Sequence, residues 1–380
     1  MIYLDYNATT PVAEEVAEAI YPYLEANMRT GNFGNPSSSH KFGEKTARAV
    51  EEARLKVADL INASAREIIF TSGGSESNNM VIKGVAAQHR EKGGHIITSE
   101  IEHPAVRKPC GYLEEKGFDV TYLKVDGTGM VAAEDVEKAI RDDTFLITVM
   151  HANNEIGTIQ PLKYIGRIAS EHDILFHTDA AQTVGKIPVD VQELGVDFLT
   201  IAGHKLYAPK GVGALFCRDH ESLIPLIHGA DHEFGLRAGT ENVILQVGLG
   251  EAASLFQTRQ KNDEGEKLRQ LTEYFYDRLK EIAGDSLQLN GHRERRLPNT
   301  LNVSFVGFEG DRLLSLAGDV AASTGAACHE DSVELSPVLS ALGMSEERGK
   351  GAVRFSLGWY TEEDELDRAA EVINKALQKY

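Results

Sequence analysis

The sequence predicts an α/β protein in which a large domain, built on a mostly parallel sheet with helices on both faces, is joined to a smaller α+β domain. Three observations support this prediction. The chain has 380 residues, of which 42% are hydrophobic, so it can bury a large core and form one large or two ordinary domains. Short apolar runs alternate with helical spacers through most of the chain. Near residue 260 this alternation gives way to polar, charge-dense helices.

The large domain is expected over residues 14–258 and opens with helix-like runs. Helical periodicity predicts helices over residues 44–60 and 76–88. The apolar runs that follow are short and are separated by helical spacers, which is typical of buried strands in a parallel sheet. The expected strands cover residues 67–71, 95–98, 120–123, 145–149, 174–177 and 198–201.

The smaller domain is expected to combine residues 1–13 with residues 259–380. Polar, charge-dense helices are predicted within residues 257–282, and a helix over residues 362–378 closes the chain. Two β-rich runs between them, residues 300–305 and 353–357, are predicted to be strands.

Charge and composition exclude several classes of partner. Lys and Arg total 39 against 58 for Asp and Glu, so the formal net charge of −19 opposes nucleic-acid phosphates and anionic membrane surfaces. The first residues lack a basic region followed by an apolar one, and no apolar run approaches the length of a spanning helix. We therefore expect no nucleic-acid or membrane partner, and a cytoplasmic location.

The three cysteines, Cys110, Cys217 and Cys328, are an odd number and lie far apart in the chain. This pattern fits neither a disulfide framework nor a close-spaced metal site, so no metal is expected and a reducing cytoplasm is favoured. Cys217 ends an apolar run and is predicted to be a buried small hydrophobe. Cys328 lies in segment 325–337, which shows no periodicity and is predicted to be a mobile loop carrying a reactive thiol.

An anion cradle is predicted where the strand ending at Thr71 passes through Gly73 and Gly74 into a helix. Bare backbone N–H groups and small hydroxyls at a helix N-terminus favour a phosphate. The chain contains neither a G-x-G-x-x-G motif nor a G-x-x-x-x-G-K-[ST] motif, so the cradle suits one phosphate rather than a dinucleotide. An ordinary capped turn is the equal alternative at this point. His103, after the next strand, is expected on the same sheet edge, although a lone histidine is usually structural.

Asp179 and Lys205 also follow predicted strands. A carboxylate at Asp179 could keep a pyridine nitrogen protonated, or it could be a helix cap. Lys205 follows an apolar strand, so burial and a lowered pKa are plausible, although most lysines lie on surfaces. Taken as a glycine loop, a histidine, an aspartate and a lysine at four successive strand ends, with a separate thiol at Cys328, these residues predict pyridoxal phosphate chemistry beside a sulfur nucleophile.

Many segments of the chain match motifs of one family. The chain resembles a class V, fold-type I pyridoxal phosphate enzyme of the cysteine desulfurase family over nearly its whole length. The resemblance implies that residues 14–258 form the domain that binds the cofactor. The matching segments are residues 3–11, 34–38, 71–79, 152–157, 177–182, 203–205, 237–240, 297–300 and 354–358.

The resemblance also implies a role for each site residue. Lys205 would bind the cofactor covalently and later move a proton, His103 would stack on the ring, and Asp179 would contact the ring nitrogen. Arg354 would grip the substrate carboxylate, and Cys328 would be the nucleophile. Gln182 and Asn154 would contact the ring hydroxyl region, with Asn154 also near the substrate; Gly74, Ser75 and His204 would hold the phosphate; and Thr240 would reach that phosphate from a second subunit, which implies a homodimer.

The implied activity is removal of sulfur from L-cysteine, giving L-alanine and a persulfide on Cys328 for a sulfur-acceptor protein such as an iron–sulfur scaffold, or for a thiolation relay. The segment around Ala326, Ala327, Cys328 and His329 equally resembles the selenocysteine lyase branch, so selenocysteine is an alternative substrate. More remote alternatives are another pyridoxal phosphate aminotransferase or lyase, and a non-catalytic scaffold. His329 could lower the thiol pKa or donate a proton, or it could be a solvated loop residue.

Two departures from the family pattern concern the cofactor site. Ala202 stands where many relatives have a serine, so one phosphate hydroxyl is missing and weaker cofactor binding is expected. Residues 228–233 are less glycine-rich than in relatives, which affects the local loop geometry.

Overall fold

The computed structural model describes residues 1–89, 93–329 and 332–380. Its largest element is a seven-stranded sheet. The six strands expected for the large domain all belong to this sheet, with ends that differ by at most two residues. In sheet order they are β2 (Ile68–Thr71), β8 (Gly213–Cys217), β7 (Phe198–Ala202), β6 (Leu175–Asp179), β5 (Thr144–Thr148), β3 (His95–Ser99) and β4 (Asp119–Leu123).

Strand direction brings the ends of β2, β7, β6 and β3 to one edge of the sheet. Strands β7, β6, β5, β3 and β4 are mutually parallel, and β8 is antiparallel to both of its neighbours. Because β8 reverses direction once on each side, β2 runs the same way as β7. The sequence analysis did not assign β8 as a strand, although its residues form an apolar run that is buried on both faces.

The prediction of four successive strand ends was wrong in one respect. The four site segments follow β2, β3, β6 and β7, and β4 and β5 intervene along the chain between β3 and β6. The segments still meet, because all four strands end at the same sheet edge. Adjacency in space here comes from parallel topology rather than from order in the sequence.

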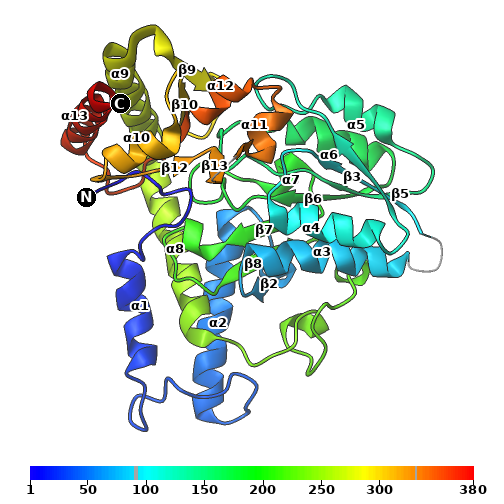
Figure 1. The fold of residues 1–380 in the computed structure, drawn as a ribbon. Coiled ribbons are helices and arrows are strands. Elements are labelled where there is room, and N and C mark those ends of the chain that lie inside the picture. Colours follow the sequence, from blue (N-terminus) through cyan, green and yellow to red (C-terminus); the bar gives the residue numbers. More distant parts are fainter. Residues whose placement is uncertain (90–92, 330–331) are drawn as a thin grey trace.

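Helices cover both faces of the sheet (Figure 1). Alternate strand residues point to opposite faces, so Ile69 packs with one helix set while Ile68 and Phe70 pack with the other. Helices α3 and α4 cover the first face. The helices of this domain are α1 (Glu14–Leu24), α2 (Lys41–Leu60), α3 (Gly74–Gln88), α4 (Pro104–Glu114), α5 (Ala133–Ala139), α6 (Leu162–Glu171), α7 (Val191–Leu194) and α8 (Val243–Lys261).

The polar helices predicted within residues 257–282 are the end of α8 and most of α9. Helix α8 ends at Lys261, and α9 begins at Glu264 after Asp263 adopts a left-handed backbone conformation with φ +56°. The polar composition continues through this break, so periodicity alone gives no signal for it. Asp tolerates the left-handed region better than most residues, which makes it a suitable junction.

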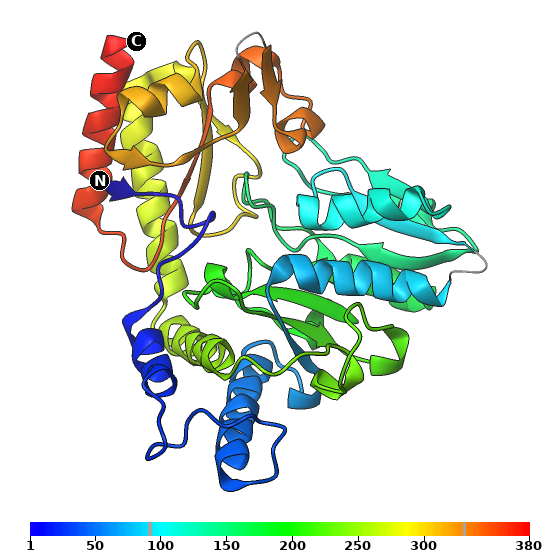
Figure 2. The same cartoon turned by 60° about the horizontal axis from the view of Figure 1, so that its bottom comes forward.

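The smaller domain has an antiparallel sheet in the order β12-β15-β10-β9, backed by helices (Figure 2). The first strand of the chain, β1 (Ile2–Tyr3), pairs with β11 of this domain, which joins the N-terminus to it. The division into residues 14–258 and residues 1–13 with 259–380 stays a proposal. The remaining elements are α9 (Glu264–Ala283), β9 (Leu287–Asn290), β10 (Thr300–Phe305), α10 (Gly310–Leu316), β11 (Val320–Ala321), β12 (Ser323–Thr324), β13 (Ala326–His329), β14 (Ser332–Leu335), α11 (Pro337–Ala341), α12 (Glu346–Lys350), β15 (Ala352–Ser356) and α13 (Glu363–Lys379).

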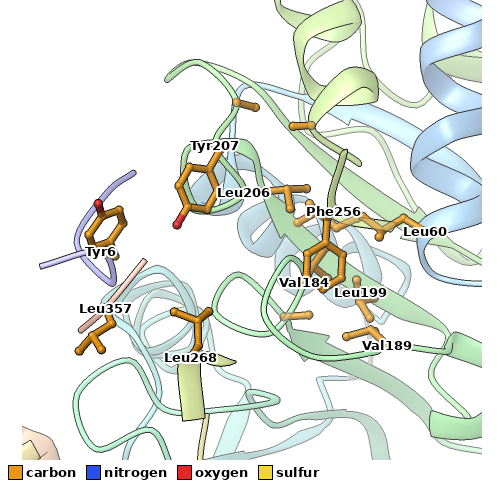
Figure 3. Close-up of a cluster of buried hydrophobic side chains, with 14 of the residues drawn as sticks. Tyr6, Leu60, Val184, Val189, Leu199, Leu206, Tyr207, Phe256, Leu268 and Leu357 are labelled. Carbon is orange, nitrogen blue, oxygen red and sulfur yellow. The ribbon is translucent and has the colours of Figure 1, made fainter. Parts of the chain in front are cut away.

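A hydrophobic cluster joins the two parts of the chain beside Lys205 (Figure 3). Tyr6 and Leu357 lie on the side of Tyr207 away from the large-domain core. The Tyr207 ring stacks on Trp359 with centroids 3.6 Å apart, and the Trp359 backbone N–H donates to the Tyr207 hydroxyl at 2.7 Å. This packing fixes the backbone immediately after Lys205.

Segment 325–337 is more regular than expected. Strands β13 and β14 form an antiparallel hairpin in which Cys328 pairs with Val333. Segment 325–337 shows no apolar alternation, so periodicity did not predict these two short strands. The tip of the predicted loop, residues 330–331, lies outside the described residues, and movement of the segment stays a prediction. Across the described ranges, none of the helices combines the length and apolarity needed to cross a membrane.

Candidate active site

A cavity of about 720 Å³ opens at the sheet edge where β2, β3, β6 and β7 end. Its size suits a small organic cofactor together with an amino acid. The N-terminal segment and β15 close it from the other side. Nine of the eleven predicted site residues line it, namely Gly74, Ser75, His103, Asn154, Asp179, Gln182, His204, Lys205 and Arg354.

The glycine cradle forms one end of this cavity. Helix α3 begins at Gly74, and its N-cap Gly73 has φ +143°, a conformation that side chains rarely allow. A Cβ placed on Gly74 would lie 3.5 Å from the Cβ of Ala202, so the cradle is narrow and apolar on that side. The unpaired N–H groups of the first helical turn therefore face a space that suits one phosphate. Ala202 offers no hydroxyl to it, as the sequence indicated.

Asp179 lies at the carboxyl end of β6 and is only 7% exposed. Its carboxylate accepts hydrogen bonds from Asn78 Nδ2 at 2.7 Å and from the Ala181 backbone N–H at 3.0 Å. The capping alternative is thus partly correct, since Asp179 does bind the turn that follows it. The carboxylate also lines the cavity, where it can accept a further proton donor such as a pyridinium nitrogen.

The Lys205 amine is held by backbone carbonyls of the N-terminal segment. It donates to the Asn7 oxygen and to the Ala8 oxygen, the latter at 2.6 Å. Burial and the nearby Arg354 guanidinium lower the pKa of Lys205 to about 8, although Asp5 and Asp179 oppose the shift. A substantial neutral fraction is therefore present near neutral pH, as a nucleophilic or proton-transferring lysine requires.

The two histidines of the cavity are held in defined orientations. His103 caps α4, and its Nδ1 accepts the Ala105 backbone N–H at 3.1 Å, so the neutral ring carries its proton on Nε2. Burial lowers the pKa of His103, against the attraction of Asp179. His204 Nδ1 lies 3.2 Å from Thr9 Oγ1, and burial beside Lys205 lowers the pKa of His204 to about 4. Both rings are therefore neutral near pH 7.

Arg354 is already engaged on three sides. Its Nη2 donates to Asp5 Oδ1 at 2.6 Å and to Ser323 Oγ at 2.9 Å, and its Nη1 donates to the Asn154 oxygen at 3.0 Å. Its Nε is buried without a hydrogen-bond partner among the described residues. Every forked contact of a guanidinium uses an Nη2 proton, so a carboxylate can be bound bidentately only if Asp5 or Ser323 is released.

Asn7 joins the site to both parts of the chain, and the sequence analysis assigned it no role. Its backbone oxygen accepts from Lys205 Nζ and from Gln182 Nε2, and its side-chain oxygen accepts from Lys186 Nζ at 2.6 Å. Its Nδ2 donates to Thr300 Oγ1 of β10 at 2.9 Å. The only sequence signal was its place in the opening motif, residues 3–11. The sequence analysis also missed Lys186. One of its partners, Asn7, is distant in the sequence, and the other, Gln182, is an uncharged amide, so neither predicts the contact.

Thr240 does not line the cavity. Thr240 is exposed and lies beside residues 32–36 in a separate surface hollow. The side chains of Cys328 and His329 lie outside the described part of the structure. The base of their hairpin is tied near the cavity, because Ser336 Oγ donates to Glu155 Oε2 at 2.6 Å and the Ser336 N–H binds the Gly325 oxygen at 2.8 Å.

The other two thiols are structural. Cys110 and Cys217 are fully buried, and burial raises the pKa of each to about 12. Thiols with such pKa values are not nucleophiles near neutral pH. The prediction that Cys217 is a buried small hydrophobe is confirmed.

The residues around the cavity fit pyridoxal phosphate. The glycine cradle suits the phosphate, Asp179 suits the ring nitrogen, and the Lys205 amine suits the aldehyde. Asn78 adds a second indication, because its Oδ1 is buried at the cavity wall with no described partner. The residues present therefore offer a contact for the phosphate, the ring nitrogen and the aldehyde of pyridoxal phosphate.

Comparisons with known proteins point to one family. The aminotransferase class-V profile matches residues 2–369. A curated cysteine desulfurase IscS from Dictyoglomus turgidum is 51% identical, covering 100% of this chain and 95% of the relative. A cysteine desulfurase IscS from Methanosarcina thermophila is 48% identical and covers 100% of this chain and 92% of the relative. Among solved structures, a NifS-like protein has a TM-score of 0.92 at 36% identity with full coverage of both chains. SspA in complex with cysteine has a TM-score of 0.82 at 42% identity, covering 95% of this chain and 100% of that one.

Proposed function

Because this chain belongs to the aminotransferase class-V family, we propose that its cavity removes sulfur from L-cysteine and passes that sulfur to Cys328. The protein is a pyridoxal-phosphate-dependent cysteine desulfurase, a sulfurtransferase that gives L-alanine. One observation carries the assignment of residues: Lys205, with its pKa lowered to about 8, shares a single cavity with Asp179, the glycine cradle and Arg354.

The cofactor would be held by residues from the ends of five strands, β2, β3, β5, β6 and β7. Gly74, Ser75 and His204 would bind the phosphate, Asp179 would contact the ring nitrogen, and His103 would contact the ring. Gln182 and Asn154 would contact the region of the ring hydroxyl. When bound, pyridoxal phosphate supplies an electron sink for the substrate Cα.

Arg354 and Lys205 act on the amino acid. Arg354 fixes the substrate carboxylate after releasing Asp5 or Ser323, and this orients the Cα–H bond. Lys205 takes the Cα proton. Its lowered pKa suits this step, because the neutral amine is the proton acceptor.

Cys328 takes the sulfur. Its thiolate attacks the substrate sulfur, so that an S–S bond forms as the C–S bond breaks. The electron pair of the C–S bond stays with the carbon skeleton, which leaves as alanine after protonation. The hairpin β13–β14 then carries the persulfide to an acceptor.

Two partners complete the proposal. A second copy of the chain places its Thr240 against the phosphate, which makes the enzyme a homodimer. The acceptor is a protein that receives persulfide sulfur, such as an iron–sulfur scaffold, and the reaction takes place in the cytoplasm. With a formal net charge of −19 on this chain, a basic or neutral acceptor surface is favoured.

The activity is tested by measuring alanine release from L-cysteine and from selenocysteine side by side. We expect turnover of cysteine with formation of protein-bound persulfide. Turnover of selenocysteine alone would replace the desulfurase assignment with that of a selenocysteine lyase. If alanine were released from neither substrate, both assignments would be refuted.

Arg354→Lys is expected to lower kcat/KM for cysteine by at least about tenfold, since a charge-assisted forked contact contributes about 1.5–3 kcal/mol. Lysine keeps the charge but cannot bind a carboxylate through two parallel N–H groups. Arg348→Lys is the matched control, because Arg348 binds the Asn290 side chain and the Leu289 oxygen away from the cavity. A value of kcat/KM equal to that of the wild type would place the carboxylate site elsewhere.

The lowered pKa of Lys205 predicts the pH at which its amine reacts. In cofactor-free protein, acylation of Lys205 by an amine-selective reagent should rise with pH to a midpoint of about 8, below the 10.5 of an ordinary lysine. Only the neutral amine reacts, so the sign follows from burial favouring deprotonation. Mass spectrometry of the Lys205 peptide measures the midpoint, with exposed Lys163 as the internal comparison. Equal midpoints for the two lysines would contradict the prediction.

A further inference from the structure

Lys186 is a buried lysine that the mechanism above does not use. It is 7% exposed and follows the turn after β6, behind the cavity wall. Its Nζ donates to two oxygens, Asn7 Oδ1 at 2.6 Å and Gln182 Oε1 at 2.5 Å. Both acceptors are neutral amides, and no ion pair joins Lys186 to a carboxylate in the described ranges. Buried charges are normally paired, so this lysine is an exception.

The surrounding charges oppose protonation of Lys186. Burial lowers its pKa most, and the nearby cations Lys205 and Arg354 lower it further. A neutral amine has two N–H groups, and two hydrogen bonds are observed. The contacts of Lys186 are therefore those of a satisfied neutral amine, whereas an ammonium would keep one buried proton without an acceptor.

Lys186, Gln182 and Asn7 are joined in a closed ring of hydrogen bonds. Gln182 Oε1 faces Lys186, so Gln182 Nε2 is turned to the Asn7 backbone oxygen at 3.0 Å. That same oxygen accepts Lys205 Nζ. Asn7 Oδ1 is occupied by Lys186 and by Asn299 Nδ2, which leaves Asn7 Nδ2 for Asn154 and Thr300. Without Lys186, the Gln182 Oε1 loses its described donor, and the Asn7 Oδ1 keeps only Asn299 Nδ2.

We propose that Lys186 is a positioning residue that works as a neutral amine: it orients the amides of Asn7 and Gln182, and through the Asn7 backbone oxygen it sets the place of the Lys205 amine. Gln182 lines the cavity, so the same contact also orients its amide toward the cofactor. Lys186 acts through these two residues and does not need to contact the substrate.

Two variants and one control test this proposal. Lys186→Met keeps the length and apolar stem but removes both donors, and Lys186→Arg adds a permanent charge. Lys163→Met, at an exposed lysine paired with Glu193, is the control and should resemble the wild type in every measurement. The first measurement is the pH midpoint of Lys205 acylation in cofactor-free protein. The second is kcat and KM for cysteine with the loaded enzyme.

Lys186→Met replaces a neutral group by a neutral group, so it removes no charge near Lys205. Lys186→Arg should lower the Lys205 midpoint by about one pH unit, because a like charge is added nearby. For turnover, Lys186→Met should lower kcat by at least about tenfold through misplacement of Lys205, with KM for cysteine altered much less since Arg354 is untouched.

An unchanged Lys205 midpoint in Lys186→Arg would show that Lys186 is already charged in the wild type, and a kcat of Lys186→Met equal to that of the wild type would show that Lys186 positions nothing; either result overturns the proposal. If Lys186→Met does not fold, the nitrogen shift of ¹⁵Nζ-lysine in the wild type gives the charge state directly, and an ammonium signal for Lys186 at pH 7 overturns it. The kcat measurement rests on the proposed function. The acylation midpoint does not, so a wild type that fails to turn over cysteine would refute the desulfurase assignment while leaving Lys186 testable.

Discussion

Lys205→Ala is expected to abolish turnover of cysteine and the visible absorbance of the lysine-bound cofactor. Two roles are lost together, the covalent hold on the cofactor and the proton transfer at Cα. Proton transfer by a positioned side chain alone contributes about 10²–10⁴-fold, so the loss of rate should exceed that range. Absorbance spectra of the purified protein and initial rates of alanine release measure the two roles separately.

Lys210→Ala is the matched control for that experiment. Lys210 also lines the cavity, but it is exposed, whereas Lys205 is partly buried. The Lys210 variant should keep the absorbance of the lysine-bound cofactor. If Lys205→Ala retained the spectrum and the rate of the wild type, Lys205 would not be the cofactor lysine.

Cys328→Ala is expected to separate the sulfur step from the cofactor step. Lys205, Asp179 and the glycine cradle lie at the sheet edge, whereas Cys328 lies on the hairpin of the smaller domain. The variant should therefore bind cofactor and show the spectral change on addition of cysteine. Persulfide formation and alanine release from cysteine should vanish, because no other described thiol is accessible.

Selenocysteine gives the Cys328 variant a second use. Selenium is a better leaving group than sulfur and can be eliminated without attack by a thiolate, so residual turnover of selenocysteine alone would favour the lyase alternative. Cys217→Ala is the matched control, since that thiol is fully buried in β8 with its pKa raised to about 12, and it should keep cysteine turnover. Alanine release from cysteine at the original rate by Cys328→Ala would make the thiol a bystander.

Residues at strand ends could be predicted from the sequence, and residues that act through long-range hydrogen bonds could not. Asp179 and Lys205 follow apolar strands, and parallel topology brings such strand ends to one edge. Asn7 and Lys186 carry no comparable signal. Lys186 follows no strand end, and the bond between Lys186 and Asn7 joins parts of the chain 179 residues apart.

Errors in the predicted elements have similar physical causes. Strand β8 was not assigned, and the residue at which α8 ends and α9 begins depends on the backbone conformation of Asp263 within a uniformly polar stretch. The present partners of Arg354 were also beyond prediction, because Asp5 reaches it from the opposite end of the chain. Each case depends on tertiary contacts rather than on local pattern.

The central claim is that sulfur from L-cysteine is transferred to Cys328. The most direct measurement is mass spectrometry of the Cys328 peptide after a single turnover with sulfur-labelled L-cysteine, without reductant or acceptor. The account predicts a gain of one labelled sulfur atom on Cys328 for each alanine released, and no gain on Cys110 or Cys217. Alanine released in equal amount with the Cys328 peptide unchanged in mass would contradict it.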